Sequence, residues 1–280
     1  MKHKPDREQT SIPVIILAGG QSNRLRVGDN LKWQLPFFRG YLADEDSYID
    51  SSSNSPFDHL FVDNNAPPVV CHKQSPTLLS FIIDRLKMQT NRIIINGPHI
   101  HNSDLETYNL PIIADLLPDF QGPLSGILTA LHWAKKQNIA WVATVSCDTP
   151  FFPKNLLQTL SDNIPCNQPE NPLRSLPDRS ANSEANNKAA IAIYQQRTHP
   201  TFGLWSQELY EPLKYALTVD ANRAVNRWAL RHAKKVKFEA STEACVSAGR
   251  EQPFENSAAI DPFFNINNLH DYKQALSYLT

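Results

Sequence analysis

The stretch Pro13-Val-Ile-Ile-Leu-Ala18-Gly19-Gly20 decides the fold class of this chain. It is a short run of apolar, mostly β-branched residues that stops at two consecutive glycines. Such a run is typical of a strand that is buried on both faces, as strands of parallel sheets are. The chain has 9 glycines in 280 residues, where about 20 would be average, so the glycines that it keeps carry weight.

Strand and helix patterns alternate after this stretch. The predicted strands cover 92–96, 110–114 and 139–145, and the predicted helices cover 76–86, 123–136 and 155–160, with Ser75 as the first N-cap before Pro76. This alternation predicts an α/β fold with a mostly parallel sheet that is covered on both faces. Further on we predict strands over 189–194, 201–205 and 235–238, a segment closing the sheet region over 263–267, and helices over 208–217, 221–233 and 269–279. The pattern leaves open whether the strands over 189–194 and 201–205 run antiparallel.

The domain organisation follows from the polar stretches. We predict an N-terminal extension over 1–12 and a single domain over 13–280. Two segments rich in Ser, Asn and Pro, near 39–74 and 162–188, are predicted to be insertions into that domain because they lack any core periodicity.

Charge and composition exclude several classes of partner. The 27 Lys and Arg against 28 Asp and Glu give a net charge of −1, so no basic excess favours nucleic acid or anionic lipid. No run approaches the ~18–20 apolar residues of a membrane span, and the start lacks the apolar core of a signal peptide. The four cysteines form no C-x-x-C pair, which argues against zinc. We therefore expect a cytoplasmic protein with reduced thiols and without nucleic-acid or membrane partners.

The residues that follow the predicted strands are the candidate site, because open parallel sheets bind ligands beyond the carboxyl ends of their strands. They are Leu17, Ala18, Gly19 and Gly20 after the first strand, Asn96 after the second, Asp115 after the third and Asp148 after the fourth. A glycine loop suits phosphate because its backbone N–H groups can approach oxyanions. Two carboxylates suit a magnesium ion that bridges phosphates.

Basic residues in the loop after the first strand, Arg24 and Lys32, can neutralise phosphate charge. Neither the Walker A spacing nor the dinucleotide fingerprint G-x-G-x-x-G is present. From the residues alone, the paired glycines are equally compatible with a tight turn. Asp148 is equally compatible with a turn carboxylate that caps Thr149-Pro150.

Six motifs occur in an order that resembles a known family. They are LAGGQSNRL from Leu17, Lys32 followed by x-x-Leu-Pro, GPLSG from Gly122, CDTP from Cys147, HPTFGLW from His199 and FNIN from Phe264. Together they resemble the signatures of the molybdenum cofactor guanylyltransferases. The resemblance implies a three-layer, Rossmann-like nucleotidyltransferase fold of the glycosyltransferase-A type with a mostly parallel sheet.

The resemblance also implies a reaction and a set of roles. The family transfers GMP from GTP to molybdopterin-bound molybdenum cofactor and releases pyrophosphate, with magnesium as cofactor. The matching positions imply nucleotide contacts at Leu17, Ala18, Gly19, Gly20, Lys32, Asn96, Asp115 and Asp148. Lys32 and Asp148 would be catalytic, Asp148 would bind magnesium, and Asn265 and Asn267 would lie near the pterin. We expect the chain to be a monomer. Its expected protein partners are molybdenum cofactor synthesis proteins and the acceptor proteins that receive the product.

The chain departs from the family in the loop before Lys32. The family motif is close to R-M-G-x-D-K, whereas here Arg24 is followed by Leu-Arg-Val-Gly-Asp-Asn-Leu-Lys32. An ungapped alignment places Asn30 at the lysine position, and an alignment from Leu35-Pro36 places Lys32 there. We prefer Lys32 because phosphate neutralisation needs a cation. The alternatives are a molybdopterin cytidylyltransferase, which shares LAGG and the lysine, and a non-catalytic cofactor-binding relative with a degenerate loop.

Overall fold

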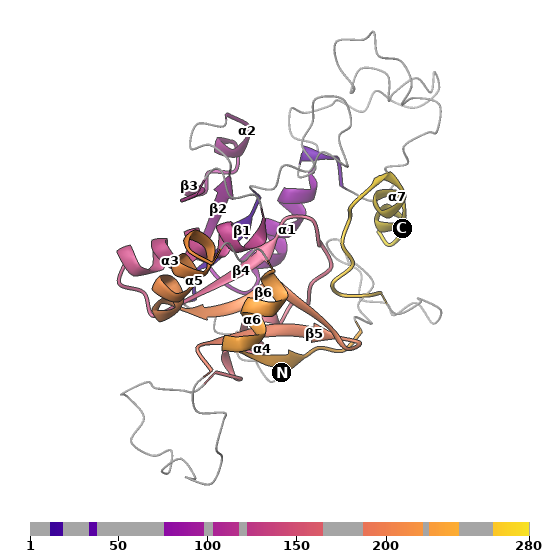
Figure 1. Ribbon diagram of the computed structural model, residues 1–280. Coiled ribbons are helices and arrows are strands. Elements are labelled where there is room, and N and C mark those ends of the chain that lie inside the picture. The colour runs from indigo at the N-terminus through magenta and orange to yellow at the C-terminus, as the bar shows by residue number, and fades with distance from the viewer. Residues whose placement is uncertain are drawn as a thin grey trace, which may run out of the picture. The chain divides into compact units, whose positions relative to one another are not determined.

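The computed structural model describes residues 12–18, 34–37, 76–97, 103–117, 122–164, 187–220, 224–240 and 260–279 (Figure 1). The chain divides into two compact units. The first, called here the sheet unit, comprises Met1–Gly20, Leu86–Ser146 and Pro153–Glu239, and the second comprises Gln21–Arg85, Cys147–Phe152 and Ala240–Thr280. The predicted insertions, except 162–164 and 187–188, lie outside the described residues. The single domain and its N-terminal extension stay predictions.

The sheet unit contains one seven-stranded sheet in the order β3-β2-β1-β4-β6-β5-β7 (Figure 1). Strand β6 runs antiparallel to both of its neighbours, and the other four pairings are parallel. The strands are β1 (Val14–Leu17), β2 (Ile93–Gly97), β3 (Ile112–Ala114), β4 (Trp141–Ser146), β5 (Ala189–Tyr194), β6 (Arg197–Ser206) and β7 (Ala233–Lys237). This arrangement confirms the predicted α/β class and the mostly parallel sheet.

The central strands of the sheet are buried on both faces, as the apolar run at the start of the chain predicts. Ile15 packs into a large core with helices on one face, while its neighbours Val14 and Ile16 are equally buried outside that core. Alternate residues of a strand point to opposite faces, so the two sets cover the two sides. The buried leucines of α4 (Leu156–Ser161), which packs against β5 and β6, also lie outside that core.

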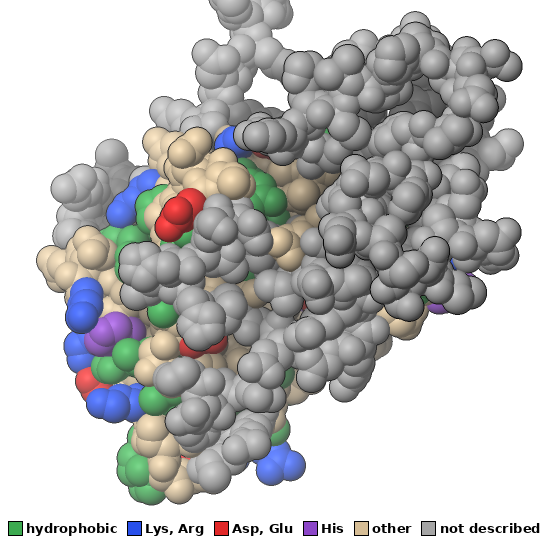
Figure 2. All heavy atoms as spheres, turned by 90° about the horizontal axis from the view of Figure 1, so that it is seen from above, with side chains coloured by type: hydrophobic (Ala, Val, Ile, Leu, Met, Phe, Trp, Pro, Cys, Tyr) green, Lys and Arg blue, Asp and Glu red, His purple; other side chains and the backbone are tan. Residues whose placement is uncertain are grey.

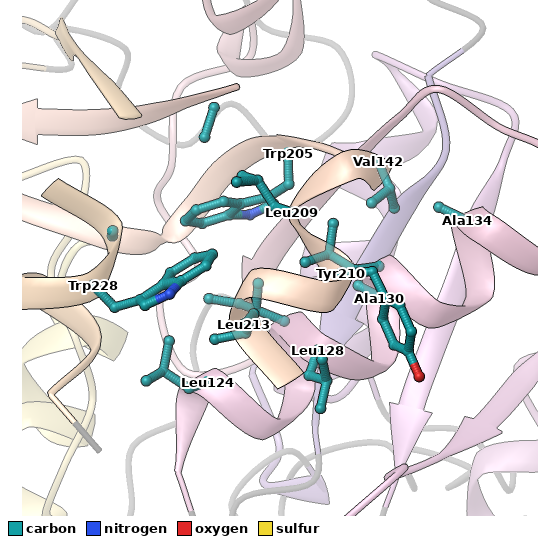
Figure 3. Close-up of a cluster of buried hydrophobic side chains, with 14 of the residues drawn as sticks. Leu124, Leu128, Ala130, Ala134, Val142, Trp205, Leu209, Tyr210, Leu213 and Trp228 are labelled. Carbon is teal, nitrogen blue, oxygen red and sulfur yellow. The ribbon is translucent and has the colours of Figure 1, made fainter. Parts of the chain in front are cut away.

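The main core joins the sheet to α3 (Pro123–Lys136), α5 (Tyr210–Thr218) and α6 (Val225–His232). Figure 3 shows Trp205 and Trp228 facing each other beside Leu213, with Leu124 and Leu128 of α3 below them. The two indole centroids are 6.0 Å apart. Inside this apolar cluster the Nε1–H of Trp205 donates to Thr144 Oγ1 at 2.9 Å, so the buried indole nitrogen is satisfied.

The second unit is built around aromatic rings. Phe37, Phe81 and Phe151 lie with ring centroids 5.1–6.3 Å apart, and Tyr278 joins them at 5.5 Å from Phe151. The hydroxyl of Tyr272, in α7 (Leu269–Ser277), donates to the Pro36 carbonyl. Edge-to-face pairs of this kind add to the burial of aromatic area.

Several predicted boundaries are wrong. Helix α1 (Leu78–Lys87) begins after Thr77, whose Oγ1 accepts from the Ser80 N–H while Ser80 Oγ accepts from the Thr77 N–H. Thr77 is therefore the N-cap in place of Ser75, in a reciprocal capping arrangement. The segment 263–267 forms no strand and does not join the sheet. Among the described elements, the sequence did not predict α2 (Ser103–Glu106), and the predicted helix over 208–217 divides into the 3-10 turn η4 (Gln207–Leu209) and α5.

The described surface carries mixed charge. In Figure 2 the basic side chains occur singly or in small groups, and a histidine with basic neighbours lies at the left edge. One such group surrounds His132, whose pKa is lowered by burial and then by the charges of Lys136, Lys135 and Lys214. Glu211 pairs with Lys135 at 2.7 Å within this group. No described helix is both long and apolar enough to span a membrane.

Gly203 provides a test of the core. A Cβ there would lie 2.7–2.9 Å from three atoms of the Trp205 indole, which is fully buried. We expect Gly203→Ala to lower the free energy of unfolding by about 1–3 kcal/mol, the usual cost of overpacking a core. Urea denaturation measures this change.

The matched control is the same substitution in a Trp205→Phe background. Phenylalanine lacks the fused ring that the new methyl group meets, so the cost of Gly203→Ala should shrink in a double-mutant cycle. An equal cost in both backgrounds would show that the indole is not the obstacle.

Candidate functional site

The sheet has a topological switch point between β1 and β4. The chain runs outward from β1 to β2 and β3, and then returns to form β4 on the other side of β1. Leu17 is in register with Asn96 on β2 and with Ser146 on β4, and the Ala18 N–H donates to the Asn96 carbonyl at 2.9 Å. Ligands of open α/β sheets bind outside the carboxyl ends of strands at such a point. The fold therefore places Leu17, Ala18 and Asn96 at the expected edge.

Asn96 and Asp115 contact each other directly at this edge. The Asn96 side-chain amide donates to Asp115 Oδ1 at 3.0 Å and to the Ile113 carbonyl at 3.3 Å. Asn96 is 1% exposed and Asp115 is half-buried. Burial raises the pKa of the Asp115 carboxyl above its ordinary value, and the hydrogen bond from Asn96 opposes this by lowering it. The sequence predicted both residues at one edge, and the structure brings them together.

Gly126 allows α3 to approach this edge closely. A Cβ at Gly126 would lie 2.9 Å from Leu17 Cδ2 and 3.1 Å from Asn96 Oδ1. Gly122, the residue before α3, has φ 143° and ψ 166°, a backbone region that is essentially restricted to glycine. The structure thus explains both glycines of the GPLSG motif. Gly122 allows the backbone conformation at the start of α3, and Gly126 leaves room for Asn96.

Two polar residues of α3 that the sequence analysis missed hold the backbone after Asp115. Thr129 Oγ1 accepts from the Leu116 N–H at 2.9 Å, and the Ser125 hydroxyl donates to the Leu117 carbonyl at 3.2 Å. Ser125 and Thr129 are 3% and 4% exposed. Their spacing of four residues on an otherwise apolar helix face is the sequence signal that could have found them.

The second unit carries the other predicted site residues. Asp148 Oδ1 accepts from the Thr149 hydroxyl at 3.2 Å, and the Asp148 carbonyl accepts from the Ile266 N–H at 2.9 Å. This second bond joins the CDTP motif to the FNIN motif, so Asp148 and Asn265 belong to neighbouring segments. Asn265 Oδ1 is buried, and no described residue donates a hydrogen bond to it. Asn267 is exposed.

The remaining predicted site residues, Gly19, Gly20, Lys32 and the alternative Asn30, lie outside the described residues, as does Arg24. Their roles stay predictions. The same holds for the predicted meeting of Asp148 with Asn96 and Asp115, because Asp148 belongs to the second unit.

The donor set fits magnesium in one particular way. The described residues include no group of three or more His, Cys, Asp or Glu side chains that could enclose a metal ion. Magnesium is usually bound through one or two carboxylates together with substrate phosphates, not in an all-protein cage. A single carboxylate such as Asp148, in a loop that follows a strand end, therefore suits a metal that arrives with a nucleotide.

Comparison with known proteins identifies the family. Residues 14–236 match the MobA-like NTP transferase domain. A molybdenum cofactor guanylyltransferase from Nitrobacter hamburgensis is 32% identical over 205 residues, which cover 71% of this chain and 79% of that protein. The chain belongs to the MobA-like NTP transferases, in the molybdenum cofactor guanylyltransferase family. This confirms the resemblance that the six motifs indicated.

The likeness extends over nearly the whole chain. A molybdenum cofactor guanylyltransferase from Mesorhizobium japonicum is 29% identical over 95% of this chain and 94% of its own length. The crystal structure of molybdopterin-guanine dinucleotide biosynthesis protein A from Archaeoglobus fulgidus covers 95% of this chain and 97% of that chain, with a TM-score of 0.55 and 14% identity. That structure bears out the fold class of a MobA-like nucleotidyltransferase.

Asp115 provides a test of the site's electrostatics. Because its folded-state pKa is raised, folding favours the protonated carboxyl, and this contribution is lost as pH rises through the folded pKa. Asp115→Asn keeps an oxygen that can accept from Asn96 and removes the charge. We expect this variant to gain stability over wild type as pH rises from about 4 towards 8, and to bind nucleotide more weakly.

Urea denaturation across this pH range measures the stability difference, with Asp220→Asn, at an exposed carboxylate, as the control. A difference between Asp115→Asn and wild type that stays constant with pH would contradict the raised pKa.

Proposed function

We propose that this chain transfers GMP from GTP to molybdopterin-bound molybdenum cofactor and releases pyrophosphate. The observation that carries the proposal is the match to the family over 14–236, with relatives named molybdenum cofactor guanylyltransferase. The site geometry supports it, because Leu17, Ala18, Asn96 and Asp115 gather at the switch point of the sheet. The product would pass to acceptor proteins in the cytoplasm, and the chain would act as a monomer.

The reaction is a phosphoryl substitution. An oxygen of the pterin phosphate forms a bond to the α-phosphorus of GTP, and the bond from that phosphorus to the oxygen bridging to the β-phosphate breaks. The electron pair of the broken bond leaves with pyrophosphate. Catalysis of such a step consists mainly of positioning the reactants and stabilising charge on the phosphate oxygens.

The residues divide this work between them. Backbone groups at Leu17 and Ala18, with the glycines that follow, would meet the nucleotide, and Lys32 would neutralise phosphate charge. Asp115 and Asn96, held to each other at 3.0 Å, would contact the nucleotide from the neighbouring strand ends.

Asp148 would hold the metal, with Asn265 and Asn267 nearer the pterin. Magnesium, when bound, supplies positive charge to the triphosphate and the leaving pyrophosphate. The backbone bond from Ile266 to Asp148 would keep the metal-binding carboxylate and the pterin-facing segment in register with each other.

Base choice tests the proposed function directly. We expect GTP to stabilise the protein more than CTP or ATP in a thermal-shift series with magnesium. We also expect GTP to support pyrophosphate release when molybdenum cofactor is supplied. If CTP is the better ligand and substrate, the chain is a cytidylyltransferase.

The charged residues are tested by three variants assayed together. Asp148→Asn keeps size and hydrogen bonding but removes the charge, so we expect turnover to fall by at least about a hundredfold with folding nearly unchanged. Lys32→Ala should also lose activity, through its phosphate contacts, while the matched substitution Asn30→Ala should be mild. Pyrophosphate release at saturating magnesium is the measurement.

Two results would revise the assignment. Near-normal turnover of Asp148→Asn would remove Asp148 from the metal site. Full activity of Lys32→Ala together with loss of activity in Asn30→Ala would show that Asn30, and not Lys32, occupies the position of the family lysine. That result would favour a loop that has lost the lysine.

A further inference from the structure

Arg85, near the end of α1, is a buried cation that the proposed reaction does not use. The residue is 7% exposed. Arginine is almost never buried to this extent unless its guanidinium is matched by acceptors. The contacts of Arg85 therefore indicate what it does in the second unit.

Two of these contacts go to the loop that carries Asp148. Arg85 Nε donates to the Phe152 carbonyl, and Nη2 donates to the Phe151 carbonyl at 3.3 Å. The guanidinium carbon also lies 5.6 Å from the centroid of the Phe152 ring. Hydrogen bonds from a charged donor are about twice as strong as neutral ones, so this fork is a firm attachment for the backbone at 151–152.

The same loop is held at its other end. The Asp148 carbonyl accepts from the Ile266 N–H at 2.9 Å. The Phe151 side chain is held as well, because its ring lies among the rings of Phe37, Phe81 and Tyr278. All of these residues belong to the second unit. The backbone of Cys147–Phe152 thus has few ways to move while Arg85 keeps both of its carbonyl contacts.

We propose that Arg85 is a positioning residue, which fixes the place of the Asp148 carboxylate by holding the Phe151 and Phe152 carbonyls. The proposal rests on the proposed function, in which Asp148 binds the metal that accompanies the nucleotide. Groups that orient a metal ligand from behind typically contribute 10–100-fold to metal affinity or activity. Arg85 reaches the ligand through the backbone and does not touch the substrate.

The shape of arginine matters to this role as well as its charge. The guanidinium is a rigid planar fork that presents several N–H donors at once, whereas lysine offers a single flexible point charge. Arg85→Lys therefore keeps the buried charge but cannot reproduce both carbonyl contacts. Arg85→Met removes the charge and all donors. Lys87→Met, at an exposed position on the same helix, is the matched control.

Hydrogen exchange of the metal-free protein is the first measurement. We expect amides in 147–152 to exchange about tenfold faster in Arg85→Lys, the change that follows from losing one charged hydrogen bond. Amides of β4 should keep wild-type exchange, and Lys87→Met should match wild type throughout. Unchanged exchange over 147–152, or faster exchange across the whole protein, would overturn the proposal.

Pyrophosphate release is the second measurement. In Arg85→Lys we expect the magnesium concentration for half-maximal rate to rise by about 10-fold or more, while the affinity for GTP without metal stays at the wild-type value. A general loss of structure would weaken the binding of both magnesium and GTP. If Arg85→Met does not fold, Arg85→Lys carries the test alone.

Asp148→Asn, assayed beside these variants, separates the two hypotheses. An inactive Asp148→Asn with wild-type magnesium dependence in Arg85→Lys would overturn the positioning role and leave the proposed function intact. An active Asp148→Asn would remove the metal role of Asp148 on which the positioning proposal rests, whereas a wild-type protein without pyrophosphate release would count against the proposed function. The exchange measurement would then still decide whether Arg85 holds the loop.

Discussion

The pairing of β1 with a strand on each of its edges is the constraint on which the rest of the structure depends. Val14 to Leu17 pair with β2 on one edge and with β4 on the other, and the side chains of Val14, Ile15 and Ile16 are fully buried while Leu17 is partly buried. Apolar side chains are strongly favoured on a strand in this position, and its polar backbone groups must be paired. Because the strand order reverses beside β1, its carboxyl end is also where the candidate nucleotide site forms.

The site at this edge is made of groups that cost stability. Burial raises the pKa of the Asp115 carboxyl, which means that the charged form is costly to bury. The hydrogen bond from Asn96 offsets part of this cost. An apolar side chain would be easier to bury at position 96 than the Asn96 amide, which needs a hydrogen-bond partner there. Carboxylates and amides kept in such positions are the usual sign of a functional site, where stability is given up for binding.

Buried polar side chains form hydrogen bonds to the loops that carry the predicted site residues Asp115 and Asp148. Ser125 and Thr129 hold the backbone after Asp115 in the sheet unit. Arg85 holds the backbone after Asp148 in the second unit. In each unit a helix supplies a buried donor or acceptor to a loop that has left its strand and needs partners for its backbone. Within each unit, a helix therefore fixes the loop that carries a predicted site residue.

The sequence by itself determined the parallel half of the sheet and the residues at the strand ends. Apolar runs and helical spacing are local, so β1, β2, β3, β4 and α3 were predicted close to their observed bounds. The order of the motifs indicated the family, and the strand ends predicted Asn96 and Asp115 at one edge.

Only the tertiary structure decided how distant segments pair. Strand β6 was predicted too short because the two-residue turn at Gln195 and Gln196 takes positive φ at both positions, where Asn-Gly is the usual signal. The segment 263–267 was predicted to close the sheet region but forms no strand. It is held instead by a hydrogen bond from the Ile266 N–H to the Asp148 carbonyl. Arg85 is a charged residue of a type that usually lies on the exposed face of a helix, yet it is buried. The last two outcomes depend on contacts between residues far apart in the chain, and local periodicity carries no information about such contacts.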